Sequence, residues 1–378
     1  MPVEYRFATT NEYTEASNFL RDNWSPNHIY IRDKALFDWT FHRRGHWPRD
    51  SYSIAVAEDA GEWVGMLGGI PFTFNFFGTK QRGAWIVNYV IRPDHRKGVT
   101  ALKLLSMFRN EQFDSTIAFG ITQASTPIYK VLRGEVLEMM PRHVLVLRGA
   151  AKRMERILAL ANPEWPVERC LALSEAFEGR SQDKVDIERS HDIPADWDER
   201  GWRAISLRTV GAERNMEYLQ WRYVDHPSFE HRVISVPDGP RSGLLVWRLE
   251  TIRRMNDDGT REDVDRFGRM LEFLPASENN AAALLAAFEC ELQQHEAVGA
   301  DYYGYHGATA RYLQAAGFVP TAAHPDGCHI PSRFQPLDRK GGNIMSAMFL
   351  KPGVPRCTTQ QDCQWYWTKS DSDQDRPN

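Results

Sequence analysis

The hydrophobic pattern of the chain repeats across its two halves. In residues 101–108, apolar side chains recur at i, i+3, i+4 and i+7, which is typical of one buried helix face. The same spacing returns in residues 281–288, at an offset of 180. A polar-to-apolar pattern repeated at a fixed distance predicts two copies of one structural unit.

Other segments match in the same order. An aromatic helical motif around Trp39 has a counterpart around Trp221. Segments with strand-like patterns also pair: 52–57 with 231–236, 64–67 with 242–245, and 85–91 with 269–274. Five matches at offsets between 178 and 184 favour an internal duplication over chance.

The pattern predicts an α/β (α+β) protein with two tandem domains. Each domain is expected to be a mixed, mostly antiparallel sheet flanked by helices. The predicted divisions are a first domain at 1–148, a linker with helical segments at 149–198, a second domain at 199–352 and a polar tail at 353–378. The linker includes a charged stretch at 180–186.

Composition excludes several classes of function. The net charge of −4 argues against a nucleic-acid partner, because phosphate binding depends on a basic surface. The first residues do not form a signal peptide, and no apolar run is long enough to span a membrane, so we expect a cytoplasmic protein without membrane insertion. Five scattered cysteines, with Cys357 and Cys363 the only close pair, predict free thiols and no metal site.

A strand, a glycine turn and a helix follow one another at 90–101. Such a turn directs backbone N–H groups and the helix dipole at one anion, typically a phosphate. Gly98 allows close backbone approach, and two of its neighbours are basic. The turn consists of His95, Arg96, Lys97, Gly98, Val99 and Thr100. The alternative is an ordinary helix start with no ligand.

In this order of elements the chain resembles the GNAT N-acetyltransferase superfamily. Its members bind the pyrophosphate of acetyl-CoA at a Gln/Arg-x-x-Gly-x-Gly/Ala turn. The turn fits with two departures, His95 for Gln or Arg and Thr100 for Gly or Ala. The resemblance covers residues 1–148 and, more faintly, 199–350, and it implies acetyl-CoA or another acyl-CoA as co-substrate.

The resemblance also implies roles for residues around the turn. Backbone groups of Val90 and Ile91 would pair with the pantetheine arm, and the next strand would splay away at 120–122. Ser125 or Thr126 would bond the same arm, and we name Ser125. Tyr129 would protonate the departing thiolate, although it lies five residues before the helix-ending glycine where four is usual. The alternative for Tyr129 is a packing role.

The second half lacks the phosphate turn. At the offset of 180, Glu278 stands in the place of Gly98 and puts a carboxylate where the pyrophosphate would lie. We therefore expect the second half to close the acceptor pocket of the first or to mediate assembly, without binding CoA in this way.

The polar tail contains three aspartates at alternate positions after a Trp-Tyr-Trp run. It resembles tails of tandem GNAT-like proteins encoded near surface-polysaccharide genes. The three aspartates would line the acceptor site and bind the amine, and Asp373 is the one that we name as catalytic, with the identity of the general base left open. A solvated tail is the alternative. Other candidate bases are Glu58, Asp59, His42, His46 and Glu272.

These observations predict an N-acyltransferase that moves an acyl group, expected to be acetyl, from CoA to a small amine acceptor. An amino sugar is one candidate acceptor. Direct attack is expected, because no nucleophile motif is present. Two alternatives remain: a non-catalytic module that binds CoA or a sugar intermediate, and a tandem aminoacyl transferase of the cell-wall-bridge type. The oligomeric state is left open.

Overall fold

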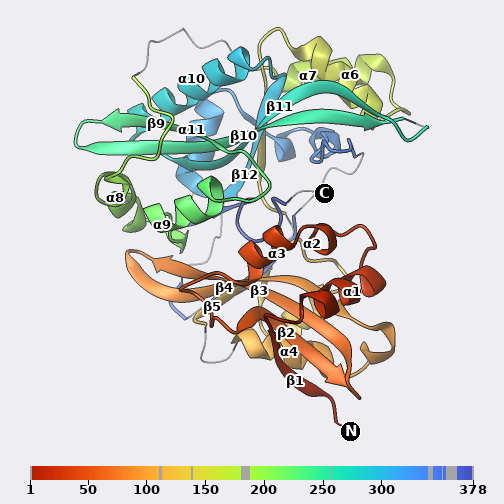
Figure 1. Cartoon of the computed structure of the whole chain (residues 1–378). Helices are drawn as coiled ribbons and strands as arrows, with labels where there is room; N and C mark the ends of the chain where they lie inside the picture. Colours follow the sequence, from red (N-terminus) through yellow and green to blue (C-terminus); the bar gives the residue numbers. More distant parts are fainter. Residues whose placement is uncertain are drawn as a thin grey trace.

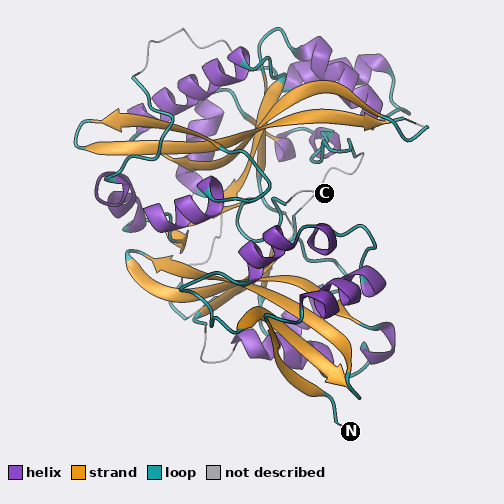
Figure 2. Cartoon of the chain, in the orientation of Figure 1, coloured by secondary structure: helices purple, strands orange, loops and turns teal. Residues whose placement is uncertain are grey.

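A computed structural model of the chain describes residues 2–109, 113–137, 139–179, 188–256, 258–338, 344–350, 352–354 and 364–376. The predicted charged stretch 180–186 and the cysteines Cys357 and Cys363 lie outside these residues. Figures 1 and 2 show two layered halves stacked on one another, each with helices packed on a twisted sheet.

The first half contributes β1 (Glu4–Thr9), α1 (Tyr13–Asn23), α2 (Ile29–Arg32), α3 (Lys34–Phe41), β2 (Ser51–Asp59), β3 (Glu62–Phe76), β4 (Thr79–Ile91), α4 (Thr100–Arg109), β5 (Ser115–Phe119), α5 (Thr126–Val131), β6 (Glu135–Leu137) and β7 (Arg142–Val146). Two helices follow, α6 (Ala151–Ala161) and α7 (Val167–Ala176). Both pack into the core of the second half, so the predicted linker helices are part of a domain.

The second half contributes α8 (Arg203–Ser206), β8 (Val210–Ala212), α9 (Met216–Leu219), β9 (Arg232–Asp238), β10 (Arg241–Met255), β11 (Arg261–Leu274), α10 (Glu278–Gln294), β12 (Gly299–Tyr305), α11 (Gly307–Ala315), β13 (Val319–Pro320), β14 (Ser346–Phe349) and β15 (Trp365–Thr368). Short helical turns lie at Pro93–His95, Asp198–Trp202, Gln220–Val224, Thr321–Ala323 and Gly327–His329.

The order of elements confirms the predicted repeat. Strands β2, β3 and β4 followed by α4, β5 and α5 recur as β9, β10 and β11 followed by α10, β12 and α11. The predicted apolar faces of α4 and α10 are both buried against their sheets. Burial of these matched faces gives each half its own core.

The two halves exchange one strand each. Strand β7, at the end of the first half, pairs with β12 and β13 of the second, with Val146 opposite Gly299. In return, β14 of the second half pairs with β5 and β6 of the first, with Ser346 opposite Phe119. The limits predicted at 148 and 352 therefore cut across the sheet pairing, because periodicity identifies a strand without identifying its partner.

The C-terminal segment, residues 364–376, lies between the halves. Strand β15 pairs antiparallel with β12 and parallel with β8, and β8 in turn pairs with β3, so one sheet runs through both halves. Asp371, Asp373 and Asp375 are 0%, 7% and 6% exposed. The alternative of a solvated tail is therefore wrong for these residues.

Candidate functional site

The glycine turn is open on its outer side. Strand β4 ends at Ile91, a helical turn follows, and α4 begins at Thr100, which is 4% exposed. A Cβ placed on Gly98 would meet nothing closer than the His95 carbonyl oxygen at 3.9 Å. Packing within the described protein therefore does not require glycine here. Close approach of a ligand to the backbone would explain why position 98 is a glycine.

The side chains of the turn differ in direction. The Nε of Arg96 donates to the Ile91 carbonyl oxygen at 3.0 Å, which fixes the guanidinium beside the end of β4. The Nε2 of His95 lies 3.8 Å from a carboxylate oxygen of Asp59 and 3.7 Å from one of Asp94. Lys97 and Val99 are exposed. An anion at this turn would meet Lys97 and the first N–H groups of α4.

Strands β4 and β5 diverge next to this turn. Their parallel pairing runs from Gly83–Ser115 to Ile86–Ala118, and within the described residues no pair follows, although β4 continues to Ile91. Asn88 has φ of 50°, and the register of β4 against β3 shifts in this region. A bulge of this kind bends one strand away from its neighbour. The opening begins at Phe119, one residue before the predicted splay at 120–122.

The C-terminal segment reaches the closed end of this opening. The Nε2 of Gln374 donates to the Phe119 carbonyl oxygen at 3.1 Å and also contacts Asp373 Oδ1 at 3.1 Å. Arg376 pairs with the Asp373 carboxylate. Asp373, the predicted catalytic carboxylate, therefore lies beside the end of β5.

A histidine that was not predicted stands on the β4 side. The Nδ1 of His28 accepts from the Tyr30 N–H at 3.3 Å, and its Nε2 lies 3.3 Å from the Asn88 amide nitrogen. The amide oxygen of Asn88 has no hydrogen-bond partner in the described part of the chain. Rotating this amide by half a turn brings that oxygen to the His28 Nε2–H and satisfies both groups.

His28 is a neutral ring at physiological pH. Burial, reinforced by the nearby charge of Arg376, lowers its pKa to about 4, although Asp373 opposes the shift. With both ring nitrogens engaged, His28 positions Asn88 and the bulge of β4. No spacing in the sequence linked His28 to Asn88, 60 residues away.

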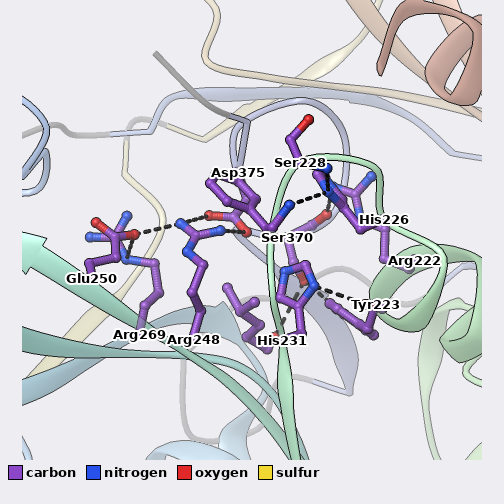
Figure 3. Close-up of polar contacts among 12 residues, drawn as sticks. Arg222, Tyr223, His226, Ser228, His231, Arg248, Glu250, Arg269, Ser370 and Asp375 are labelled. Carbon is purple, nitrogen blue, oxygen red and sulfur yellow. Dashed lines mark hydrogen bonds and ion pairs between the residues drawn. The ribbon is translucent and has the colours of Figure 1, made fainter. Parts of the chain in front are cut away.

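Three arginines of the second half hold the C-terminal segment. Arg214 forms hydrogen bonds with both carboxylate oxygens of Asp371, at 2.8 and 2.9 Å. Arg248 does the same with Asp375, also at 2.8 and 2.9 Å (Figure 3). Arg222 donates to the carbonyl oxygens of residues 370 and 372. The alternating aspartates thus anchor the segment, and Asp373 between them faces the first half.

Several other predicted residues lie elsewhere. The Oγ of Ser125 is engaged in its own turn, where it donates to the Thr122 carbonyl oxygen at 2.9 Å. Tyr129 is 2% exposed in the core beneath α4, where it packs against Phe349, and burial raises its pKa. The structure does not bring Tyr129 together with Asp373, because Tyr129 packs in the core with α4 whereas Asp373 borders a small cavity with Tyr30 and Ile70.

The remaining candidate bases have structural partners. Glu272 is fully buried and accepts from Arg214 and from the hydroxyls of Tyr223 and Tyr366. Burial raises its pKa, opposed by the charge of Arg214. Its contacts place it inside the second half, away from the opening between β4 and β5.

Comparison with known proteins identifies the architecture. No family model and no curated protein matches the sequence. Among solved structures, Saccharomyces cerevisiae N-myristoyltransferase with bound myristoyl-CoA is similar over 96% of this chain and 84% of its own, with a TM-score of 0.55 and 11% identity. A GCN5-related N-acetyltransferase from Anabaena variabilis is similar over 92% and 72%, with a TM-score of 0.54 and 11% identity. The chain has the GNAT fold in two tandem copies.

A third structure with the GNAT fold, a GCN5-related N-acetyltransferase from Kribbella flavida, has a TM-score of 0.51 at 13% identity and covers 92% of this chain and 71% of its own. At these identities the likeness establishes the fold, and activity must be argued from the site. In the described residues, no group of three His, Cys, Asp or Glu side chains is arranged to hold a metal ion. None of the described helices is long and apolar enough to cross a membrane.

The second GNAT copy has its opening filled by the chain itself. Strand β15 joins β12 where β12 leaves β11, and the Tyr366 hydroxyl accepts from the Phe273 N–H at 2.9 Å. At the start of α10, Ser277 caps the helix by accepting from the Asn280 N–H, and Glu278 follows it. Both positions that would receive a CoA are thus occupied by side chains of the protein.

Proposed function

We propose that the protein is an acyl-CoA-dependent N-acyltransferase whose first half binds the acyl-CoA. The proposal is supported chiefly by one juxtaposition: a buried carboxylate, Asp373, lies at the closed end of the opening between β4 and β5. An open glycine turn follows the C-terminal end of β4, at the other end of this opening. A long, bent ligand with an anion at one end and a reactive group at the other matches this pair of features.

The residues that would hold the acyl-CoA are those of the turn and of the end of β4. The turn from His95 to Thr100 would take the pyrophosphate, with Lys97 and Gly98 at its outer side. Backbone groups of Val90 and Ile91, which have no β5 partner among the described residues, would pair with the amide-bearing arm, and the Ile91 carbonyl oxygen would exchange its contact with Arg96 for one with the arm. The thioester supplies an activated acyl carbon, and bound in this way it would point toward Phe119 and Asp373.

The protein would then act mainly by placing the amine and removing its proton. A protonated amine must become neutral before it attacks, and Asp373 is the carboxylate that would take this proton. Its partner Arg376 restrains the carboxylate, and the amide of Asn88 is restrained by His28. Tyr129 is the proposed proton donor to the leaving thiolate. In that role, the buried Tyr129 hydroxyl would have to reach the thioester sulfur in the opening between β4 and β5.

The acceptor would approach from between the two halves. A small cavity of about 10 Å³, room for roughly one water molecule, lies beside the C-terminal segment. Its walls include Tyr30, Trp39, Arg222, Asp373 and Asp375. Acidic and aromatic walls suit a polar amine such as an amino sugar, and the cavity must widen to admit one. We place this reaction in the cytoplasm, as an activity linked to surface-polysaccharide synthesis.

Calorimetric titration with acetyl-CoA, followed by a thiol-release assay over a panel of amines, tests the proposal. Binding together with amine-dependent release of CoA supports it. Absence of acetyl-CoA binding contradicts it.

A non-catalytic CoA-binding module is the second candidate function. The burial of Tyr129 favours it, because transfer would require an accessible proton donor for the leaving thiolate whereas binding would not. Tight binding without thiol release for any amine would support this second function over the first.

A further inference from the structure

The closed end of the opening between β4 and β5 is blocked by a side chain from the other end of the sequence. The Gly120 N–H donates to the Met345 carbonyl oxygen on the β14 side. In a trans peptide the C=O points opposite to the N–H, so the Phe119 carbonyl points toward β4. There it meets the Gln374 amide at 3.1 Å in place of a strand partner.

The glycine after Phe119 leaves room for this amide. Gly120 has φ of +73°, and a Cβ added there would lie 2.6 Å from both terminal atoms of the Gln374 side chain. Glycine is the residue that adopts this backbone conformation without strain and without a side chain in the way. The backbone at Gly120 and the side chain of Gln374 therefore fit one another, and a larger residue at position 120 would displace Gln374.

Buried aromatic side chains pack around Phe119. Trp367, which is fully buried, contacts Phe119 edge-on with ring centroids 6.3 Å apart. Trp85, on β4, stacks on Phe72 at 3.9 Å and is also fully buried. On the other face of the sheet, the side chains of α4 are packed against the same strands. In the described part of the chain, the small cavity beside Asp373 holds about 10 Å³, which is too little for a long acyl chain.

We infer that Gln374 sets the acyl length that the protein accepts and that the donor carries an acyl group of only a few carbons. The inference rests on the proposed function, because it assumes that the thioester lies in the opening between β4 and β5. A longer chain would have to displace the Gln374 amide and leave the Phe119 carbonyl oxygen buried without a donor. Losing a buried partner of this kind is costly, so discrimination should rise with each added methylene.

The test is calorimetric binding of acetyl-, butanoyl- and hexanoyl-CoA to the full-length protein. For the wild type we expect the dissociation constant to rise at least about tenfold from acetyl- to hexanoyl-CoA. Gln374→Ala should reduce this ratio to about threefold or less, and Gln374→Asn, which is one methylene shorter, should admit butanoyl- before hexanoyl-CoA. The matched control is Gln364→Ala, in the same C-terminal segment but with an exposed side chain, which should keep the wild-type ratio.

Thermal unfolding of each variant checks that it is folded at the temperature of the titration, so that the dissociation constants of folded proteins are compared. A wild type that binds all three acyl-CoAs equally would overturn the inference while leaving the proposed function intact. An unchanged ratio in both Gln374 variants, folded as judged by their melting, would also overturn it. No binding of any acyl-CoA to the wild type would instead remove the proposed function itself, and the inference with it.

Discussion

The Trp39 and Trp221 rings stack on one another, with centroids 4.9 Å apart and planes 21° from parallel. The Trp39 indole N–H also donates to the Trp221 carbonyl oxygen at 3.1 Å. These are the two tryptophans of the repeated motif, so the duplication brings its own copies face to face. Arg43 lies over the Trp221 ring at 4.0 Å and Arg222 over the Trp39 ring at 5.1 Å, a near-symmetric arrangement. The contact joins the two halves beside the C-terminal segment.

We predict that these two rings are energetically coupled. A double-mutant cycle with Trp39→Leu and Trp221→Leu, followed by urea unfolding, should give a coupling free energy of about 0.5–1.5 kcal/mol, as measured for other aromatic pairs. If the losses in the free energy of unfolding of the two single variants add up to that of the double variant, the stacking contributes nothing beyond the burial of each ring.

Gly98→Glu copies the second half into the first, and we predict that it abolishes acyl-CoA binding. A carboxylate facing a pyrophosphate repels it by several kcal/mol in a partly enclosed site, or about a thousandfold in affinity. The control is Val167→Glu, which adds the same charge at the first residue of α7, where the side chain is 53% exposed. Calorimetry should show unchanged binding for the control. Equal affinity of Gly98→Glu and the wild type would refute the assignment of the turn.

The repeated units were predictable because each copy contains its own local pattern. The helix spacing in 101–108 and 281–288 and the strands before them depend on neighbours in sequence, and the structure confirms them. The exchange of β7 for β14 was not predictable, because either strand would satisfy either sheet edge in hydrogen bonding. Choosing between them requires the three-dimensional path of the chain.

The tail shows the other limit of sequence reasoning. Composition alone treats Asp371, Asp373 and Asp375 as solvated, since isolated carboxylates are rarely buried. The partners of Asp371 and Asp375, Arg214 and Arg248, lie more than 120 residues away in the sequence, and only the fold brings them together. The same holds for Gln374 at Phe119, 255 residues distant. The candidate catalytic role of Asp373 stays a prediction, although its location beside β5 agrees with it.

Asp373→Asn should slow acyl transfer without weakening acyl-CoA binding. The amide keeps the size of the carboxylate but cannot take a proton, so we expect kcat/KM to fall about 100- to 10,000-fold, the range typical of a lost general base. The acetyl-CoA dissociation constant should change less than about threefold. Asp192→Asn, at an exposed loop position, is the control. Unaltered turnover in Asp373→Asn would exclude this carboxylate as the base.

The Arg248–Asp375 pair should stabilise the fold far more than a surface pair. Burial would raise the pKa of Asp375, but the charges of Arg248 and Arg269 hold that pKa below its usual range. Arg248→Met leaves the buried carboxylate without its bidentate partner and should cost about 3–5 kcal/mol in the free energy of unfolding. Lys34→Met, which breaks the exposed pair with Asp38, should cost at most about 1 kcal/mol. If the double variant Arg248→Met/Asp375→Leu fails to recover stability, the loss came from packing or from Glu250, the second buried carboxylate that Arg248 binds.

His143 makes stability depend on pH in the neutral range. The side chain is 1% exposed on β7, and neither ring nitrogen has a hydrogen-bond partner in the described residues. Burial lowers its pKa from 6.5 to about 4, so the folded protein keeps the ring neutral while the unfolded chain takes up a proton. Above pH 6.5, His143 is neutral in both states and does not reduce the free energy of unfolding. As the pH falls from 6.5 toward 4, the unfolded chain binds a proton that the folded protein does not, so the free energy of unfolding decreases. Between pH 7.5 and 5.5, the free energy of unfolding of the wild type should therefore fall by about 1 kcal/mol more than that of His143→Phe.

The control His191→Phe replaces a ring that is 62% exposed and should follow the wild-type curve. Urea unfolding at both pH values measures the difference, and parallel curves for wild type and His143→Phe would show that the ring does not titrate with folding.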